Sequence, residues 1–344
     1  MPKDEEKNSA APRHLPIRSN PDMENFDIVK TYNRLLADDP ELTMPVAAIE
    51  ALIEALGASS AMTVFETMDL VKTQSEKLRA AFANPVALSH GTNLFQQYLV
   101  MSLKQPGEAA SNRNFEVVRQ HLMRNGRLFA ARAKEAREKI ASVGRQYIHD
   151  NTTILTHGGS RVVGTLLGRA AENLPGDPKR RFKVIYVVND ARRTESNRVV
   201  AALRARGVPV ATIDDSAVAY CMPKADMVLV GAEAVMADGG VVSRLGTYSI
   251  AVLARAHHKD FFVAAEQHKI GKTFPLGQFD AGFEQNLLDF HASKAQEGGG
   301  AHEAPAPVAD PVDYTPPEYI EAFFADHGVK APSAIAKEVI DMLF

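Results

Sequence analysis

Apolar residues recur at helical spacing through the first part of the chain. Ile49, Ile53 and Leu56 are four and three positions apart, which places them on one face of a helix. The pattern extends from about residue 26 to residue 150, and the longest predicted helix runs from Phe115 through Tyr147. Proline and glycine divide the pattern into four or five predicted helices, with breaks at Pro40, Pro45, Gly57, Pro85 and Pro106–Gly107.

Short β-rich runs alternate with helical runs after Asp150. Uninterrupted apolar strands joined by helices are typical of a parallel sheet covered on both faces. The predicted strands are Thr153–His157, Phe182–Val188, Val208–Ile213, Asp226–Gly231 and Asp260–Ala265. The predicted helices are Arg161–Glu172, Ser196–Arg206, the short Ala217–Met222 and Tyr248–His257. The expected fold class is α/β, with an N-terminal helical domain followed by a doubly wound parallel sheet.

The predicted domains follow these changes of pattern. Residues 1–22 are polar and rich in proline, and we expect a disordered leader there. Residues 23–150 form the expected helical domain, and residues 151–344 form the expected α/β domain. Within the second domain, the Gly-, Ala- and Pro-rich stretch 296–310 predicts a flexible loop.

Composition and charge narrow the class of protein. The 344 residues carry 39 Lys and Arg against 42 Asp and Glu, so the chain lacks the basic excess typical of nucleic-acid binding. The single cysteine, Cys221, can form neither an internal disulfide nor a thiolate zinc site, which favours the reducing cytoplasm. No apolar run is long enough to cross a membrane. The histidines lack metal-ligand spacing, so we expect no metal site.

Polar residues follow several of the predicted strands. In an open parallel sheet, ligands bind outside the carboxyl ends of the strands. The turn Gly158–Arg161 lies between a strand and a helix, so its N–H groups, with Ser160 and Arg161, are candidates for binding a phosphate. The alternative is that its two glycines only satisfy the geometry of a tight turn. The turn lacks the G-x-G-x-x-G spacing of dinucleotide-binding proteins, which argues against a nicotinamide dehydrogenase.

Glu233 and Lys269 follow two later strands and extend this candidate site. The Glu233 carboxylate could accept hydrogen bonds from sugar hydroxyls or act as a base, and an ion-paired or helix-capping carboxylate is the alternative. The segment Glu266–Thr273 is not a phosphate-binding P-loop, because Glu266 stands where that motif requires glycine.

Three separated segments carry a resemblance to a known family. They are Ile154–Val163, which reads ILTHGGSRVV, the run Ala217–Lys269, and Val312–Ile335, which begins VDYTPPEYI. Together they resemble the alpha-subunit family of eukaryotic translation initiation factor 2B, and the resemblance covers nearly the whole chain from about Phe26. It implies a Rossmann-like α/β domain, related to methylthioribose-1-phosphate and ribose-1,5-bisphosphate isomerases, preceded by a helical domain.

The chain departs from those isomerases at two positions that matter for catalysis. The resemblance implies a cysteine directly after the Thr-His of the first strand and an aspartate in Gly-Ala-Asp, where this chain has Gly158 and Glu233. Glycine supplies no thiol proton donor, and the longer glutamate displaces its carboxyl group by about one methylene. The isomerases' Glu-Thr-Arg-Pro segment is also replaced, at residues 189–195. We therefore expect no catalytic residue, and a sugar-phosphate isomerase is the alternative function.

The resemblance still implies a pocket for a small anion, without a cofactor. The expected ligand is a phosphorylated sugar or a nucleoside monophosphate. The residues expected to bind it are Gly158, Ser160, Arg161, Glu233 and Lys269.

The function that the resemblance implies is regulatory. Alpha-type subunits form a homodimer and join two sets of beta, gamma, delta and epsilon subunits into the decameric guanine-nucleotide exchange factor. They help to bind the phosphorylated alpha subunit of initiation factor 2, whereas exchange itself belongs to the gamma and epsilon subunits.

We expect the segment Thr63–Lys72 of the helical domain to contact the phosphorylated partner, because assembly occupies the α/β domain. Its predicted exposed residues are Thr63, Glu66, Thr67 and Asp69, between the apolar Val64, Met68 and Val71. A solvated helix face is the alternative interpretation. If the segment binds the partner, charge reversal at Glu66 weakens that binding and leaves the homodimer intact.

Overall fold

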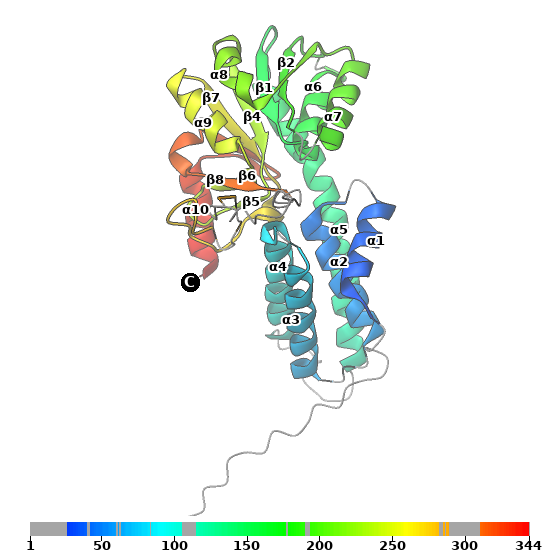
Figure 1. Cartoon of the computed structure of the whole chain (residues 1–344). Helices are drawn as coiled ribbons and strands as arrows, with labels where there is room; N and C mark the ends of the chain where they lie inside the picture. Colours follow the sequence, from blue (N-terminus) through cyan, green and yellow to red (C-terminus); the bar gives the residue numbers. More distant parts are fainter. Residues whose placement is uncertain are drawn as a thin grey trace, which may run out of the picture.

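The computed structural model contains a helical region followed by an α/β region (Figure 1). It describes residues 26–39, 42–59, 61, 63–82, 84–104, 115–176, 178–189, 193–281, 285, 287–288 and 310–343. The predicted leader 1–22 lies outside the described residues, as does the predicted loop 296–310 except for Asp310.

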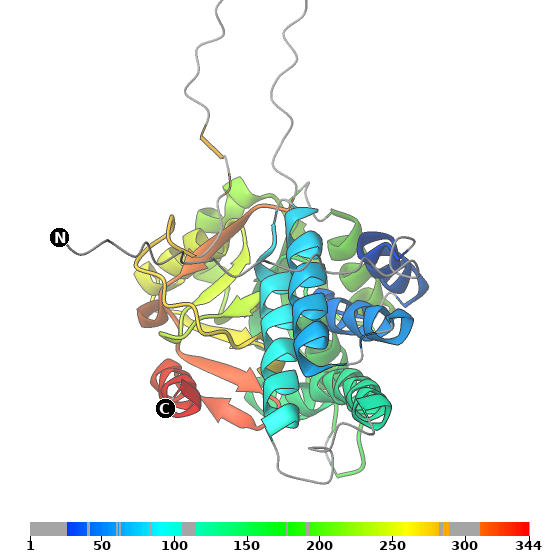
Figure 2. The ribbon, with the colours of Figure 1, turned by 90° about the horizontal axis from the view of Figure 1, so that it is seen from below.

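Five α-helices precede the sheet in the described residues, as the sequence pattern predicts. The Asp27 side chain accepts hydrogen bonds from the N–H groups of Val29 and Lys30 and so caps the first helix. The second helix packs against the other four, which explains why it is buried on nearly all sides. Figure 2 shows the third and fourth helices side by side. The helices are α1 (Ile28–Asp38), α2 (Met44–Ala58), α3 (Val64–Ala80), α4 (Val86–Lys104) and α5 (Phe115–Gly144), which continues into the 3₁₀ turn η3 (Arg145–Tyr147).

The long helix α5 belongs to both regions. It packs against α2 and, further along, against α6 (Arg161–Ala170). Met123 of α5 packs against the core of the helical region, whereas Ile140 is buried in the core of the sheet. A Cβ at Gly144 would lie 2.2 Å from a methyl carbon of Leu166, so glycine permits the close approach of α5 to α6.

The main sheet contains all five predicted strands, in parallel, with ends within two residues of the prediction. Two further strands extend one edge, the second of them antiparallel. The described strands form a seven-stranded sheet in the order β10-β9-β7-β4-β1-β2-β3. These strands are β1 (Thr153–His157), β2 (Lys183–Val187), β3 (Val210–Ile213), β4 (Met227–Gly231), β7 (Asp260–Ala264), β9 (Ala322–Ala325) and β10 (Gly328–Lys330).

Helices cover both faces of this sheet, which confirms the doubly wound arrangement. On one face, α5, α6 and α7 bury Ile140, Val163 and Leu203. On the other face, α8, α9 and α10 contribute to a second core. The remaining helices and turns are α7 (Arg193–Ala205), η5 (Asp215–Ala217), α8 (Val218–Cys221), η6 (Met222–Lys224), α9 (Thr247–Ala256), η7 (Gln267–Lys269), η8 (Pro317–Tyr319) and α10 (Pro332–Leu343).

A second, small antiparallel sheet was not predicted from the sequence. Its strands are β5 (Ala234–Val235), β6 (Val241–Arg244) and β8 (Val312–Thr315), in the order β5-β6-β8. Val242 and Val312 of this sheet are buried in one cluster with Val86 of α4. The small sheet therefore connects the α/β region to the helical region.

Candidate functional site

From β1 the chain adds β2 and β3 on one side of the main sheet and then adds β4 and β7 on the other side, so the direction of strand addition reverses at β1. This strand pairs with β2 on one side and with β4 on the other, so the connections that follow β1 and β4 diverge and leave a crevice between them. Gly158 directly follows β1, and Glu233 lies just beyond β4. The fold therefore brings these two predicted residues to the position where open α/β sheets bind ligands.

Arg244, at the end of β6, lies at the centre of this position and was not predicted. Its guanidinium group forms an ion pair with Glu233 and a second one, 3.3 Å from Nη1 to Oδ1, with Asp310. The side chains of Arg244 and Glu233 are only 10% and 12% exposed. Asn84, from the helical region, donates a hydrogen bond to the Asp310 carbonyl at 3.1 Å. The Glu233 carboxylate is thus ion-paired, one of the two interpretations that the sequence left open.

Close packing and backbone conformation both require the two glycines of the predicted turn. Gly158 and Gly159 have φ angles of +85° and +67°, which side-chain-bearing residues seldom adopt. A Cβ at Gly158 would lie 3.2 Å from Cγ of Arg244. The N–H of Gly159 donates to the Tyr186 hydroxyl at 3.1 Å, and burial raises the pKa of Tyr186 to about 12. The neutral Tyr186 hydroxyl therefore accepts from an N–H group that was a candidate for binding a phosphate.

Ser160 stabilises the start of its own helix, whereas Arg161 contacts the helical region. The Ser160 hydroxyl caps α6 by accepting a hydrogen bond from the N–H of Val163 at 3.4 Å. Arg161 Nη1 donates to the carbonyl of Leu42 at 2.6 Å, which joins α6 to the helical region. Nη1 of Arg161 thus lies at the contact between α6 and the helical region.

A buried histidine supports the backbone of Arg244. His157 Nε2 lies 2.7 Å from the Thr247 hydroxyl, which itself donates to the Arg244 carbonyl at 2.6 Å. The hydroxyl proton is thus used on the carbonyl, so His157 donates from Nε2. Burial lowers the pKa of His157 to about 4, and the charge of Arg244 adds to this effect. His157 is therefore neutral at pH 7.

Asp313 of the VDYT segment holds the start of α9. Its Oδ2 accepts hydrogen bonds from the N–H groups of Gly246, at 2.7 Å, and Tyr248, at 3.1 Å. Its Oδ1 is buried and has no hydrogen-bond partner within the described residues. Burial raises the pKa of Asp313 to about 7. This carboxyl group fixes α9 to the small sheet next to Arg244.

Lys269 is held by a buried carboxylate. Its Nζ lies 2.8 Å from Oε2 of Glu266 and donates to the Ala232 carbonyl at 2.9 Å. Burial by itself would raise the pKa of Glu266, but the charge of Lys269 contributes to holding it at about 2. Glu266 also lies 3.6 Å from Nε of Arg137 on α5. The Lys269 charge is therefore balanced inside the protein, close to the carbonyl that precedes Glu233.

The predicted partner segment forms the start of α3. Thr63 and Glu66 form a capping box, in which the Thr63 hydroxyl accepts from the Glu66 N–H at 3.1 Å and the Glu66 carboxylate accepts from the Thr63 N–H at 3.2 Å. Asp69 is exposed. These residues lie at the opposite end of α3 from Asn84, roughly 25 Å away for a helix of this length. The two predicted sites are therefore separate.

The prediction that Thr67 is exposed was wrong. Thr67 is buried and donates its hydroxyl proton to the Thr63 carbonyl, whereas Val64 is 47% exposed and Phe65 is 77% exposed. The capping box fixes where the helix begins, and the buried stripe then follows Thr67 and Val71. Phe65 and Asp69 are four positions apart on α3, so these two exposed side chains lie next to each other on the helix surface.

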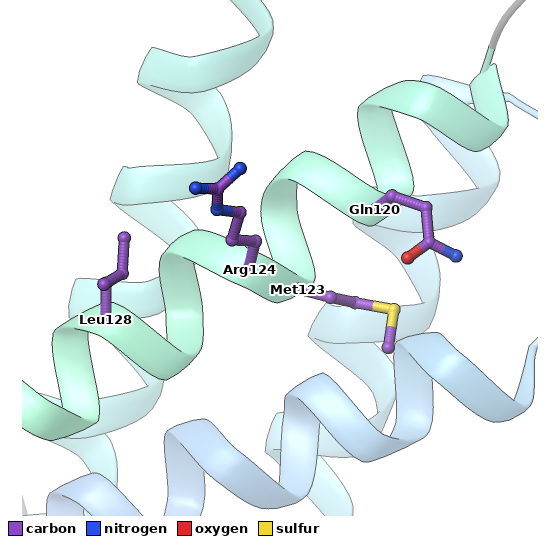
Figure 3. Close-up of a pocket in the computed structure, with 4 residues that line it drawn as sticks. All are labelled: Gln120, Met123, Arg124 and Leu128. Carbon is purple, nitrogen blue, oxygen red and sulfur yellow. The ribbon is translucent and has the colours of Figure 1, made fainter.

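A separate hollow of about 340 Å³ lies along α5, and its lining includes one charged residue, Arg124. Figure 3 shows its four residues projecting from α5, with Met123 toward α2. The other three are Gln120, Arg124 and Leu128, none of which belongs to a predicted site.

The described part of the chain has neither a candidate metal cluster nor a candidate membrane-spanning helix. No group of three or more His, Cys, Asp or Glu side chains there could hold a metal ion. No helix in that part is long and apolar enough to span a membrane.

Curated relatives are similar to the chain over most of its length. The translation initiation factor eIF2B subunit alpha of Dictyostelium discoideum is 31% identical over 92% of this chain and 97% of the relative. The protein of the same name in Caenorhabditis elegans is 28% identical over 92% and 98%. A ribose 1,5-bisphosphate isomerase of Archaeoglobus fulgidus is 29% identical over 64% of this chain and 67% of the relative.

Solved structures share the fold. A translation initiation factor eIF-2B of Pyrococcus horikoshii has a TM-score of 0.65 at 22% identity, covering 89% of this chain and 97% of that one. A chain of the tetrameric eIF2B-beta2-delta2 complex of C. thermophilum has a TM-score of 0.67 at 18% identity, covering 91% and 92%. The model of the initiation factor 2 subunit family matches residues 37–332. The chain, with its helical region and doubly wound sheet, belongs to the initiation factor 2 subunit family.

Proposed function

We propose that this chain is a non-catalytic, alpha-type regulatory subunit of translation initiation factor 2B, acting in the cytoplasm. The observation that carries the proposal is the similarity to two eIF2B alpha subunits over 92% of the chain. In this role the chain forms a homodimer that joins two sets of beta, gamma, delta and epsilon subunits. The assembled factor then binds the phosphorylated alpha subunit of initiation factor 2.

The geometry of the crevice supports a role without catalysis. General acid–base catalysis needs a side chain that can exchange a proton with a bound substrate, and the resemblance to the isomerases places a thiol and a carboxyl group at positions 158 and 233. Glu233 is ion-paired with Arg244, and a thiol side chain at position 158 would crowd the Arg244 stem in an unfavourable backbone conformation. The similarity to a ribose 1,5-bisphosphate isomerase keeps isomerisation as the alternative function to test.

We propose a phosphorylated sugar or nucleoside monophosphate as the ligand of this crevice. Arg244 lies at the centre of the crevice, so we propose it as the cation that meets the phosphate, in competition with its two ion-pair partners, Glu233 and Asp310. Ligand binding to the folded state raises the unfolding temperature, with a gain of about 2.7 kcal/mol at one hundred times the dissociation constant. Thermal unfolding with a series of sugar phosphates tests this, and Arg244→Met should remove any shift.

Affinity purification of the tagged chain from its native cytosol tests the regulatory function. We expect the other four subunits in equal amounts, with the phosphorylated form of initiation factor 2 enriched over the unphosphorylated form. Recovery of the chain alone as a homo-oligomer that isomerises ribose 1,5-bisphosphate or methylthioribose 1-phosphate would instead establish the alternative.

A further inference from the structure

A basic cleft lies at the edge of the main sheet opposite Glu233 and Arg244. Its volume is about 270 Å³, and it opens at the amino-terminal ends of β1, β2 and β3. Among the described residues that line it, none is acidic and five are basic. The basic residues are Lys179, Arg180, Arg181, Lys183 and Arg206.

The positive charge of this cleft is only partly balanced. Lys179, Arg181 and Lys183 are exposed, and none of the three has an ion-pair partner within the described residues. Arg206 lies 3.7 Å from Glu172, but Glu172 is also 3.3 Å from Arg169. The chain as a whole has a net charge of −3, so this local excess of cations differs from the rest of the molecule.

The backbone that carries these cations is fixed by hydrogen bonds. The N–H groups of Lys179, Arg180 and Arg181 donate to Asn173 Oδ1, to the Ala170 carbonyl and to Asp150 Oδ1, at 3.0, 2.8 and 2.8 Å. All three N–H groups are therefore already used, and they form no nest for a phosphate. A ligand would therefore contact the charged side chains of this segment, whose backbone is fixed, and not its N–H groups.

Apolar residues complete the lining of the cleft. Phe182 and Val208 are 4% and 6% exposed, and Ala171 and Pro209 lie beside them. The buried Phe182 ring offers no exposed face on which a nucleic-acid base could stack, and the volume is far too small for a double helix. Cations beside an apolar surface suit carboxylates that flank an apolar side chain.

We propose that this cleft is a docking surface for an acidic segment of a partner protein, rich in Asp and Glu with an interspersed apolar residue. The lysine and arginine side chains pair with the carboxylates, and the apolar side chain lies against the accessible Ala171 and Pro209. The surface is separate from the crevice at Glu233 and from the start of α3, so it adds to the proposed function and does not depend on it.

Fluorescence anisotropy with the full chain and a labelled peptide of alternating Glu-Asp pairs and single Leu residues tests the proposal. The variant Lys179→Glu, Arg181→Glu, Lys183→Glu removes three cations from the cleft. The matched control, Lys139→Glu, Arg198→Glu, Lys224→Glu, makes the same charge change at exposed positions elsewhere. We expect the cleft variant to bind about tenfold more weakly, because several small ion-pair terms are lost together, and the control to bind like the original chain.

Three further measurements decide the interpretation. Thermal unfolding shows whether both variants fold like the original chain, and the single variant Lys183→Glu replaces the triple variant if it does not. Affinity for the peptide should fall as salt is raised from low to physiological concentration. Equal losses in the cleft and control variants would overturn the proposal. So would preferential binding of a single-stranded RNA oligonucleotide that the cleft variant abolishes.

Discussion

At the scale of single residues, buried polar side chains satisfy backbone groups that would otherwise lack a hydrogen-bond partner. Arg145 is 2% exposed, and its guanidinium donates to the carbonyls of Arg169, Glu172 and Pro178, the last two at 3.0 and 2.9 Å. One side chain thus satisfies the carbonyl groups around the end of α6, where a positive charge is also favourable.

Replacing Arg145 by Leu should lower the free energy of unfolding by about 2–4 kcal/mol, because buried carbonyl groups lose their donors. Urea denaturation of the purified chain measures the change. Arg198→Leu, at an exposed position on α7, is the matched control and should change stability by about 0.5 kcal/mol or less. Equal stability of the two variants would contradict this role of Arg145.

The Asp313 carboxyl group should make stability depend on pH. Its pKa is about 7 in the folded protein against an ordinary value of 3.8, so the folded protein binds more protons between about pH 4 and pH 7. The contribution of Asp313 to stability therefore decreases as pH rises through this range. Asp313→Asn keeps an oxygen for the N–H groups of Gly246 and Tyr248 and removes the buried charge.

The stability of Asp313→Asn relative to the original chain should therefore increase from pH 4 to pH 8, by up to a few kcal/mol. Denaturation at a series of pH values measures this difference. Taking the difference removes the shared contributions of His157 and Glu266, which titrate in both proteins. Asp341→Asn, at an exposed position, should show no such trend. A constant difference across the pH range would show that Asp313 is not the titrating group.

At the scale of elements, five strands of the main sheet were predictable because each is a short β-rich run that alternates with a helical run in the sequence. The small sheet was not, because β5 has two residues and β6 pairs with β8 from about seventy positions later in the chain. Arg244 was missed for the same reason: its partners, Glu233 and Asp310, come from separate connections. The sequence predicted that Gly158 and Glu233 would meet, since both follow neighbouring strands, but not the cation between them.

The start of α3 allows a clean test of partner binding. Asp69→Lys should weaken binding of the phosphorylated alpha subunit of initiation factor 2 by about threefold to tenfold, because an exposed charge is reversed next to Phe65. Biolayer interferometry with the assembled complex measures the effect. Unchanged discrimination between phosphorylated and unphosphorylated partner would remove this segment from the site.

Charge reversal at Glu66 has a second effect that needs its own control. It breaks the capping box with Thr63, which costs about 1 kcal/mol of helix stability. Glu66→Gln removes the charge and keeps a capping side chain, so it separates the loss of a partner contact from the loss of the helix start.

At the scale of the whole molecule, the loop that follows β7 and η7 exposes large apolar side chains. Phe274, Leu276 and Phe279 are 63%, 87% and 91% exposed. The loop is held in place because Gln278 accepts a hydrogen bond from the Tyr314 N–H at 2.9 Å and donates to the Tyr314 carbonyl. Exposed apolar side chains on a loop held in place are typical of protein interfaces, which makes this loop a candidate for the contact in the proposed homodimer.

The double variant Leu276→Asp, Phe279→Asp should therefore shift the chain from dimer to monomer, with a dimer dissociation constant raised by about a hundredfold or more. Analytical ultracentrifugation over a range of concentrations measures the shift. Met101→Asp, exposed on α4 in the helical region, is the matched control. A dimer of unchanged affinity would place the homodimer contact elsewhere.

The shared helix α5 limits how this protein can move. Met123 packs with one core and Ile140 with the other, and the same continuous helix carries both, so bending α5 between them would break its backbone hydrogen bonds. Because α5 packs against both α2 and α6, we expect a displacement of one region to be transmitted to the other. In the proposed regulatory function, such a linked movement would change how subunits bound to the two regions are oriented relative to one another.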